Sequence, residues 1–97
     1  MSNGANRHER FDTQLAAFAH ARRRNLGLSQ AALAEELGLD QATVSKVENG
    51  QRRLTAGETM QWLEALGMSA HDIGTQLATL WEQFGQRPST LWSQNGT

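Results

Sequence analysis

Two short helical patterns, joined at Gly38, occupy residues 30–47 and constrain the fold of this chain more than any other stretch. Their apolar positions recur at helical spacing: Leu33, Ala34 and Leu37 in the first pattern, and Val44 and Val47 in the second. Because only about three residues connect the patterns, the two helices must cross steeply and pack immediately. Such a crossing needs a small residue at the contact, Ala34, and a turn residue that tolerates positive φ, Gly38. We expect Leu39, directly after the turn, to enter the core.

Helix-start signals divide the rest of the chain into further helices. A first helix is predicted over residues 10–25, and four residues with side chains typical of N-caps precede the others: Ser29, Asp40, Thr55 and Ser69. Proline occurs once and β-branched residues are few, so the predicted fold class is all-α. The predicted organisation is a flexible segment at 1–9, a five-helix domain at 10–84 whose fifth helix covers 69–84, and a tail at 85–97.

Two short motifs bracket the pair of helices around Gly38. Gly-Leu-Ser-Gln at residues 27–30 opens the stretch, and Glu-Asn-Gly at residues 48–50 closes it. With these motifs, residues 22–68 resemble the Cro/repressor (Xre-like) helix-turn-helix family. The resemblance implies a five-helix Cro/repressor-like DNA-binding domain, with the helix-turn-helix at the second and third helices. The third helix is then expected to enter a DNA major groove.

The resemblance also implies which residues meet DNA. On the third helix the positions that match base-contacting residues of the family are Gln41, Ala42, Thr43 and Lys46. Glutamine can pair with adenine through two hydrogen bonds, lysine can donate to guanine, and methyl groups can meet the thymine methyl. The positions expected at phosphates are Gln30, Ser45, Arg52 and Arg53. The alternative for the four third-helix positions, and for Arg52 and Arg53, is an ordinary solvated surface.

One charged pair in the matching stretch is assigned to structure instead. Similar repressors pair an arginine late in the first helix with a glutamate late in the third, and the corresponding residues here are Arg23 and Glu48. A bidentate, partly buried ion pair at these positions would lock the first helix to the reading helix.

A wide apolar stripe runs along the predicted fifth helix, through Ile73, Leu77, Leu80, Trp81 and Phe84. Either the stripe covers the core of its own chain, or it meets a second copy. Because the first four helices already supply a core, we expect a homodimer whose interface includes Leu77, Leu80, Trp81 and Phe84, with Trp62 as a further candidate.

Composition narrows the function. Basic residues outnumber acidic ones in residues 1–53 and the reverse holds in 54–97, although the net charge is only −1. The chain has no cysteine and no apolar run of membrane-spanning length, so we expect a cytoplasmic protein. The three histidines lack the spacing of a metal site, and no nucleophilic constellation or phosphate-binding loop is visible. We therefore expect no enzyme activity, no cofactor and no small-molecule ligand.

These features together predict a homodimeric transcriptional repressor that binds a palindromic operator in double-stranded DNA. The alternative is a protein of a different functional class, a protein-binding module. The protein could be the antitoxin of a toxin–antitoxin pair, with its DNA-binding domain regulating its own operon and the fifth helix or the tail binding a toxin.

Overall fold

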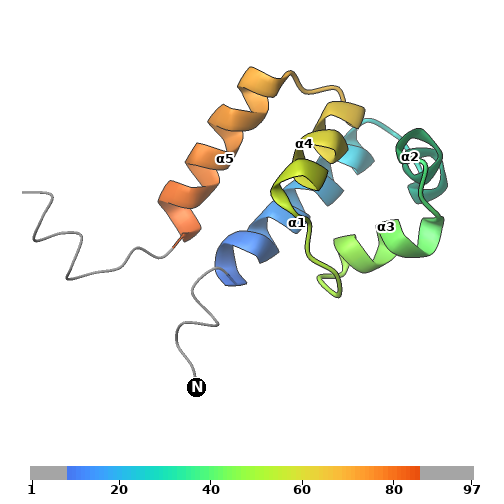
Figure 1. Cartoon of the computed structure of the whole chain (residues 1–97), viewed down its shortest axis with the longest axis horizontal. Helices are drawn as coiled ribbons and strands as arrows, with labels where there is room; N and C mark the ends of the chain where they lie inside the picture. The colour runs from blue at the N-terminus through green and yellow to red at the C-terminus, as the bar shows by residue number, and fades with distance from the viewer. Residues whose placement is uncertain (1–8, 86–97) are drawn as a thin grey trace, which may run out of the picture.

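The computed structural model describes residues 9–85, and these residues form an all-helical fold, as predicted. The helices are α1 (Glu9–Asn25), α2 (Gln30–Leu37), α3 (Gln41–Glu48), α4 (Ala56–Ala65) and α5 (Ala70–Phe84). Helix α1 runs through the middle of the molecule, with α5 on one side and the α2–α3 pair at the opposite end (Figure 1). Helix α5 packs on α1 and α4, whereas α3 packs on α1 and α2. The two ends of the molecule are therefore a helix-turn-helix end and an α5 end.

The starts of α2 to α5 follow local sequence signals. Each predicted N-cap residue has extended backbone, and its side-chain oxygen accepts a hydrogen bond from the amide three residues later: Ser29, Asp40, Thr55 and Ser69. At α4 the cap is reciprocal, because Glu58 accepts from the backbone N–H of Thr55 at 2.9 Å. Such caps satisfy amides that have no partner inside the helix, which explains why these helices begin where they do.

The turn between α2 and α3 has the backbone expected of it. Gly38 has a φ of 71°, and the N–H of Leu39 donates to the carbonyl of Ala34 at 2.8 Å, which closes α2. A Cβ on Gly38 would meet no atom within 4 Å, so the backbone conformation alone demands glycine. The expectation that Leu39 enters the core is wrong, since it is 42% exposed. Leu39 is the single residue between the turn and the Asp40 cap, and it lies at the outer corner.

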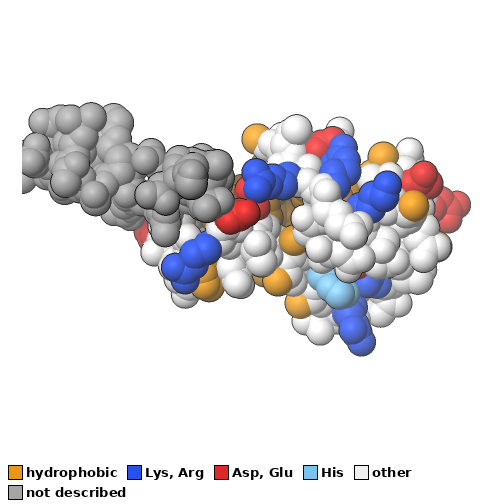
Figure 2. Space-filling model, turned by 90° about the horizontal axis from the view of Figure 1, so that it is seen from below, with side chains coloured by type: hydrophobic (Ala, Val, Ile, Leu, Met, Phe, Trp, Pro, Cys, Tyr) orange, Lys and Arg blue, Asp and Glu red, His pale blue; other side chains and the backbone are white. Residues whose placement is uncertain are grey.

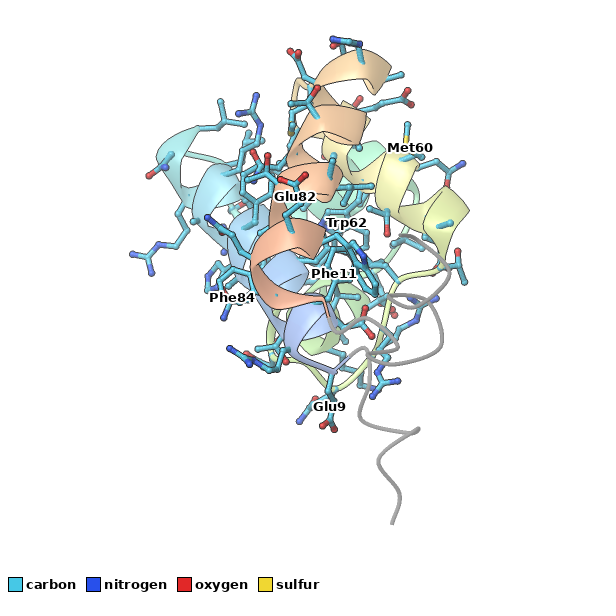
Figure 3. The ribbon with its side chains drawn as sticks, turned by 90° about the vertical axis from the view of Figure 1, so that its left-hand side faces the viewer. Glu9, Phe11, Met60, Trp62, Glu82 and Phe84 are labelled. Carbon is cyan, nitrogen blue, oxygen red and sulfur yellow. The ribbon has the colours of Figure 1, made fainter. Side chains whose placement is uncertain are left out.

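The core draws on every helix. Its buried apolar residues are Leu15, Ala19, Leu33, Ala34, Val44, Val47, Trp62, Leu63, Leu66, Ile73 and Leu80. Trp62 is 2% exposed, so its proposed contact with a second chain is wrong. Figure 3 labels Trp62 among the side chains of the helix bundle, where it belongs to the core cluster.

Most of the apolar stripe on α5 faces the chain's own core. Ile73 is fully buried and Leu80 is 6% exposed, so Leu80 is wrong as a dimer contact. The side chain of Trp81 is half-buried and packs edge-to-face on Phe11, with ring centroids 5.2 Å apart. The reason is geometric: α5 packs on both α1 and α4, so its apolar face is covered within the chain. Leu77, Trp81 and Phe84 keep some exposed surface.

The predicted end segments at 1–9 and 85–97 lie outside the described residues, except for two of their members. Glu9 is the first residue of α1, and Gly85 is the C-cap of α5. Within residues 9–85, no helix is both long enough and apolar enough to span a membrane.

Candidate nucleic-acid interface

Helix α3 has one buried face and one face open to solvent. Val44 and Val47 anchor it in the core, while Gln41, Ala42 and Lys46 are exposed. The spacing of four residues between Ala42 and Lys46 places them on the same face. An eight-residue helix anchored in this way can present its outer face to a partner without unfolding.

The structure adds Asn49 to this face, which the sequence analysis did not consider. Asn49 is exposed, ends α3 as its C-cap and donates from its Nδ2 to the hydroxyl of Ser45 at 3.4 Å. Asn49 follows Ser45 by four residues and Gln41 by eight, and this spacing could have indicated that the three share one face of the helix.

Thr43 and Ser45 are less open than the other predicted contacts on α3. The hydroxyl of Thr43 donates to the Asp40 carboxylate at 2.6 Å, and the Thr43 amide donates to the same oxygen at 2.9 Å. These two hydrogen bonds hold the pKa of Asp40 below its ordinary value of 3.8. The Thr43 hydroxyl therefore stabilises the start of α3. Its methyl group is the part of the side chain that could contact a base.

The predicted ion pair of Arg23 and Glu48 is present. Arg23 donates from Nε to one carboxylate oxygen of Glu48 at 2.7 Å and from Nη2 to the other at 3.0 Å. The side chain of Glu48 is 1% exposed. Burial raises the pKa of Glu48, but the hydrogen bonds from Arg23 and Gln30 and the charge of Arg23 outweigh it, so the pKa lies below 4.5. The carboxylate stays ionised at neutral pH.

Two further residues reach the same carboxylate. Gln30 donates from Nε2 to Glu48 Oε1 at 2.9 Å, and His20 Nε2 lies 3.6 Å from that oxygen. His20 precedes Arg23 by one helical turn, so its proximity to Glu48 could have been anticipated once the ion pair was assigned. Glu48 thus links α1, α2 and α3 at one point.

Gln30 was expected at a phosphate, and in the structure its carboxamide contacts other side chains. While its nitrogen donates to Glu48, its oxygen accepts from Nε2 of Gln41 at 3.4 Å. A residue at the start of α2 is thereby connected to the first residue of the candidate reading helix.

Both arginines of the loop after α3 face acidic groups. Arg52 donates from Nη1 and Nη2 to the two oxygens of Glu58, at 3.2 and 2.8 Å. The Arg52 guanidinium, with the Thr55 amide, lowers the pKa of Glu58 to about 2. Arg53 Nε lies 3.7 Å from a carboxylate oxygen of Asp12. The sequence analysis expected these arginines at phosphates and identified neither acidic partner.

Charges of both signs mix on the surface around α3. Figure 2 views the molecule from the side on which α3 lies in Figure 1, and blue and red side chains are neighbours there instead of forming one basic patch. A nucleic-acid phosphate would therefore have to compete with carboxylates for some of the arginines.

Residues 9–85 contain no group of three or more histidine, cysteine, aspartate or glutamate side chains that could hold a metal ion. The features of the site are hydrogen-bonding amides, one exposed lysine and paired arginines. Such groups bind polar and anionic surfaces through hydrogen bonds and charge.

Comparison with known proteins agrees with this geometry. The family model described as helix-turn-helix matches residues 20–73, which is more than half of the chain and includes all of α2, α3 and α4. No curated protein and no solved structure matched the chain. The chain belongs to the helix-turn-helix family of the Cro/C1 (Xre-like) type, a family of DNA-binding transcriptional regulators.

Proposed function

We propose that this protein is a homodimeric repressor that reads a palindromic operator with α3. The observation that carries the proposal is the exposed face of α3. This face presents Gln41, Ala42 and Lys46, while buried valines on the opposite face anchor the helix in the core. The donors and acceptors on this face complement base edges in the major groove, whose pattern differs for each base pair. By occupying the operator, the protein would exclude polymerase without any chemistry of its own.

The proposed contacts fall into two groups. Gln41, Ala42, Lys46 and the methyl group of Thr43 would meet base edges, and Asn49 joins them as a candidate. Gln30, Ser45, Arg52 and Arg53 would meet phosphates. Base contacts carry sequence preference, whereas phosphate contacts position the protein and supply affinity that depends on salt.

Dimerisation is proposed because one reading helix covers few base pairs. Two copies related by a two-fold axis would place their α3 helices in successive major grooves, roughly 34 Å apart. Helix α5 is at the other end of the molecule from α3, so a contact there would leave both reading helices free (Figure 1). The surface that remains for this contact is the exposed part of Leu77, Trp81 and Phe84, since Leu80 is buried.

The antitoxin alternative remains a second proposal of a different class. Among the described residues, the large apolar side chains that are clearly exposed are Leu26 and Leu39, and neither is on α5. A toxin on α5 would therefore have to use the same partly exposed Leu77, Trp81 and Phe84 that are proposed for the dimer. Co-purification of the protein with a small protein encoded beside it would support the alternative. Either role on DNA would place the protein in the cytoplasm with the nucleoid.

Selection of binding sites from a random duplex pool tests the main proposal. The expected result is a palindromic consensus whose binding weakens steeply with added salt. Gln41→Ala and Lys46→Ala should each relax preference at one position, by about 1–3 kcal/mol, whereas Arg53→Ala should weaken binding to all duplexes alike. Gln61→Ala, at an exposed position of α4, is the matched control for Gln41→Ala. A pool that shows no enrichment, or affinity that does not change with salt, would refute the proposal.

A further inference from the structure

The loop after α3 is fixed to the end of the proposed reading helix. The backbone N–H groups of Gln51 and Arg52 donate to the carbonyl of Lys46, at 2.8 and 3.2 Å. Because these hydrogen bonds join the loop to the last turn of α3, the loop follows α3 when that helix enters a groove. Arg53, the next residue of the loop, is thereby carried toward the phosphates that border the groove.

Arg53 has a carboxylate partner within the chain before it meets any phosphate. Its Nε lies 3.7 Å from an oxygen of Asp12 on α1, and the two side chains are 61% and 31% exposed. This distance is the longest among the arginine–carboxylate pairs of residues 9–85. Arg52, in contrast, donates two hydrogen bonds to Glu58. Arg53 is therefore the loop arginine that can change partners more easily.

The surroundings of the Arg53–Asp12 pair allow it to open. Both residues line an open hollow of about 340 Å³ between the start of α1, the loop after α3 and the end of α5. Because the Arg53 side chain is mostly exposed, its guanidinium can turn away from Asp12 without displacing a buried side chain. Asp12 remains favourably placed without Arg53, since it lies in the first turn of α1, where the helix dipole stabilises a negative charge.

We infer that Asp12 is an intramolecular competitor of the DNA phosphate for Arg53, and that it limits the affinity of the protein for every duplex. A carboxylate and a phosphate both accept hydrogen bonds from a guanidinium, so the two anions compete for the same donors. Each binding event breaks the contact with Asp12, and this cost offsets part of the gain from the phosphate contact. Asp12 acts through Arg53 without touching DNA, so it is a positioning residue. The inference rests on the proposed phosphate contact of Arg53.

The decisive variant is Asp12→Asn, which removes the competing charge and changes the size of the side chain little. The expected result at low salt is an affinity higher by about two- to fivefold, the range that corresponds to an exposed ion pair. The gain should be the same for the selected operator and for a duplex of arbitrary sequence, because a phosphate contact carries no sequence preference. Asp12→Glu keeps the charge and should stay close to the wild type.

Glu9→Gln is the matched control. Glu9 is also in the first turn of α1 and lines the same hollow, and it forms no ion pair with another described residue. The substitution removes the same charge from the same helix without releasing an arginine. Its gain in affinity should therefore be clearly smaller than that of Asp12→Asn.

A double-mutant cycle with Arg53→Ala separates direct competition from the general electrostatic field. If Asp12 acts through Arg53, Asp12→Asn in the Arg53→Ala background should increase affinity no more than Glu9→Gln does there. If Asp12 acts only by repelling the duplex, its gain should be equal with and without Arg53.

Fluorescence anisotropy with both duplexes across a salt series gives the affinities, and circular dichroism checks that helical content is unchanged. The inference is overturned if Asp12→Asn gains no more than Glu9→Gln, if its gain persists in the Arg53→Ala background, or if only one of the duplexes is affected. Failure of the proposed function gives a different result. Either Arg53→Ala would leave binding to both duplexes unchanged, which removes the basis of the inference as well, or the wild-type protein would select no operator. In the second case the cycle on the arbitrary duplex still decides the inference.

Discussion

Arg52 and Glu58 form a two-point ion pair between the loop after α3 and the first turn of α4, with N–O distances of 3.2 and 2.8 Å. The same carboxylate accepts from the backbone N–H of Thr55 and so completes the capping box of α4. One acidic side chain therefore both starts a helix and holds an arginine that is proposed to meet phosphate.

Glu58→Gln should release Arg52 without damaging the helix start, because glutamine also serves in a capping box. The free guanidinium, with a nearby negative charge removed, should increase affinity for non-specific duplex DNA severalfold at low salt. Fluorescence anisotropy across a salt series measures the effect. Glu64→Gln, also on α4 and exposed, removes the same charge without breaking an ion pair of the described residues. Equal gains in the two variants would show that only net charge matters.

Arg23→Ala should destabilise the fold strongly, because it leaves the buried Glu48 carboxylate without its main partner. Removing one partner of a buried pair costs about 3–5 kcal/mol. The adjacent Arg24→Ala is the control, since Arg24 is exposed. Urea unfolding gives both free energies of unfolding. A loss in Arg23→Ala no larger than that in Arg24→Ala would contradict the structural assignment of this pair.

Stability should fall when the pH drops below about 4.5. Glu48 and Glu58 both have pKa values below 4.5 in the folded chain, and that of Glu58 is about 2. The unfolded chain therefore binds protons first, and the stabilisation present above pH 4.5 is lost as the pH falls through the folded values. Unfolding at pH 7 and pH 3 measures the loss. Glu48→Gln should show a smaller loss between these pH values than the wild type.

Gly38→Ala should destabilise the turn by about 1–2 kcal/mol, because L-residues are strained at positive φ. A clash with a more distant part of the chain is excluded, since a Cβ there would meet no atom within 4 Å beyond the neighbouring residues. Gly74→Ala provides the opposite case: Gly74 lies inside α5 with equally open surroundings, and alanine should stabilise the helix by about 1 kcal/mol. Thermal melting of the two variants checks the signs, and an unchanged midpoint for Gly38→Ala would contradict the turn assignment.

Ala78→Arg should separate the proposed dimer without disturbing the core. Ala78 is exposed and lies beside Leu77, one helical turn before Trp81. A charged side chain there would be buried without a partner in an α5–α5 contact. Gln83→Arg adds the same charge on another exposed part of α5 and should stay dimeric. Sedimentation and circular dichroism should be measured together; a folded Ala78→Arg protein that remains dimeric would place the interface elsewhere.

The local structure of this protein follows from interactions between residues that are close in the chain. The side chains of Ser29, Asp40, Thr55 and Ser69 bond to amides three residues away, and Gly38 adopts a backbone conformation that other residues avoid. Both effects act within one helical turn, so they can be read from neighbouring residues. The helix-turn-helix family was likewise evident from its motifs at residues 27–30 and 48–50.

Which surfaces and charges meet depends on how the helices pack against each other. Helical periodicity shows that α5 has an apolar face, but it does not show what covers that face, and Leu80 proved to belong to the chain's own core. The pairing of Arg52 with Glu58, and the link from Glu48 through Gln30 to Gln41, join separate elements of the chain. Such contacts depend on the packing of whole helices, because a side chain finds its distant partner only after the helices have set their relative positions.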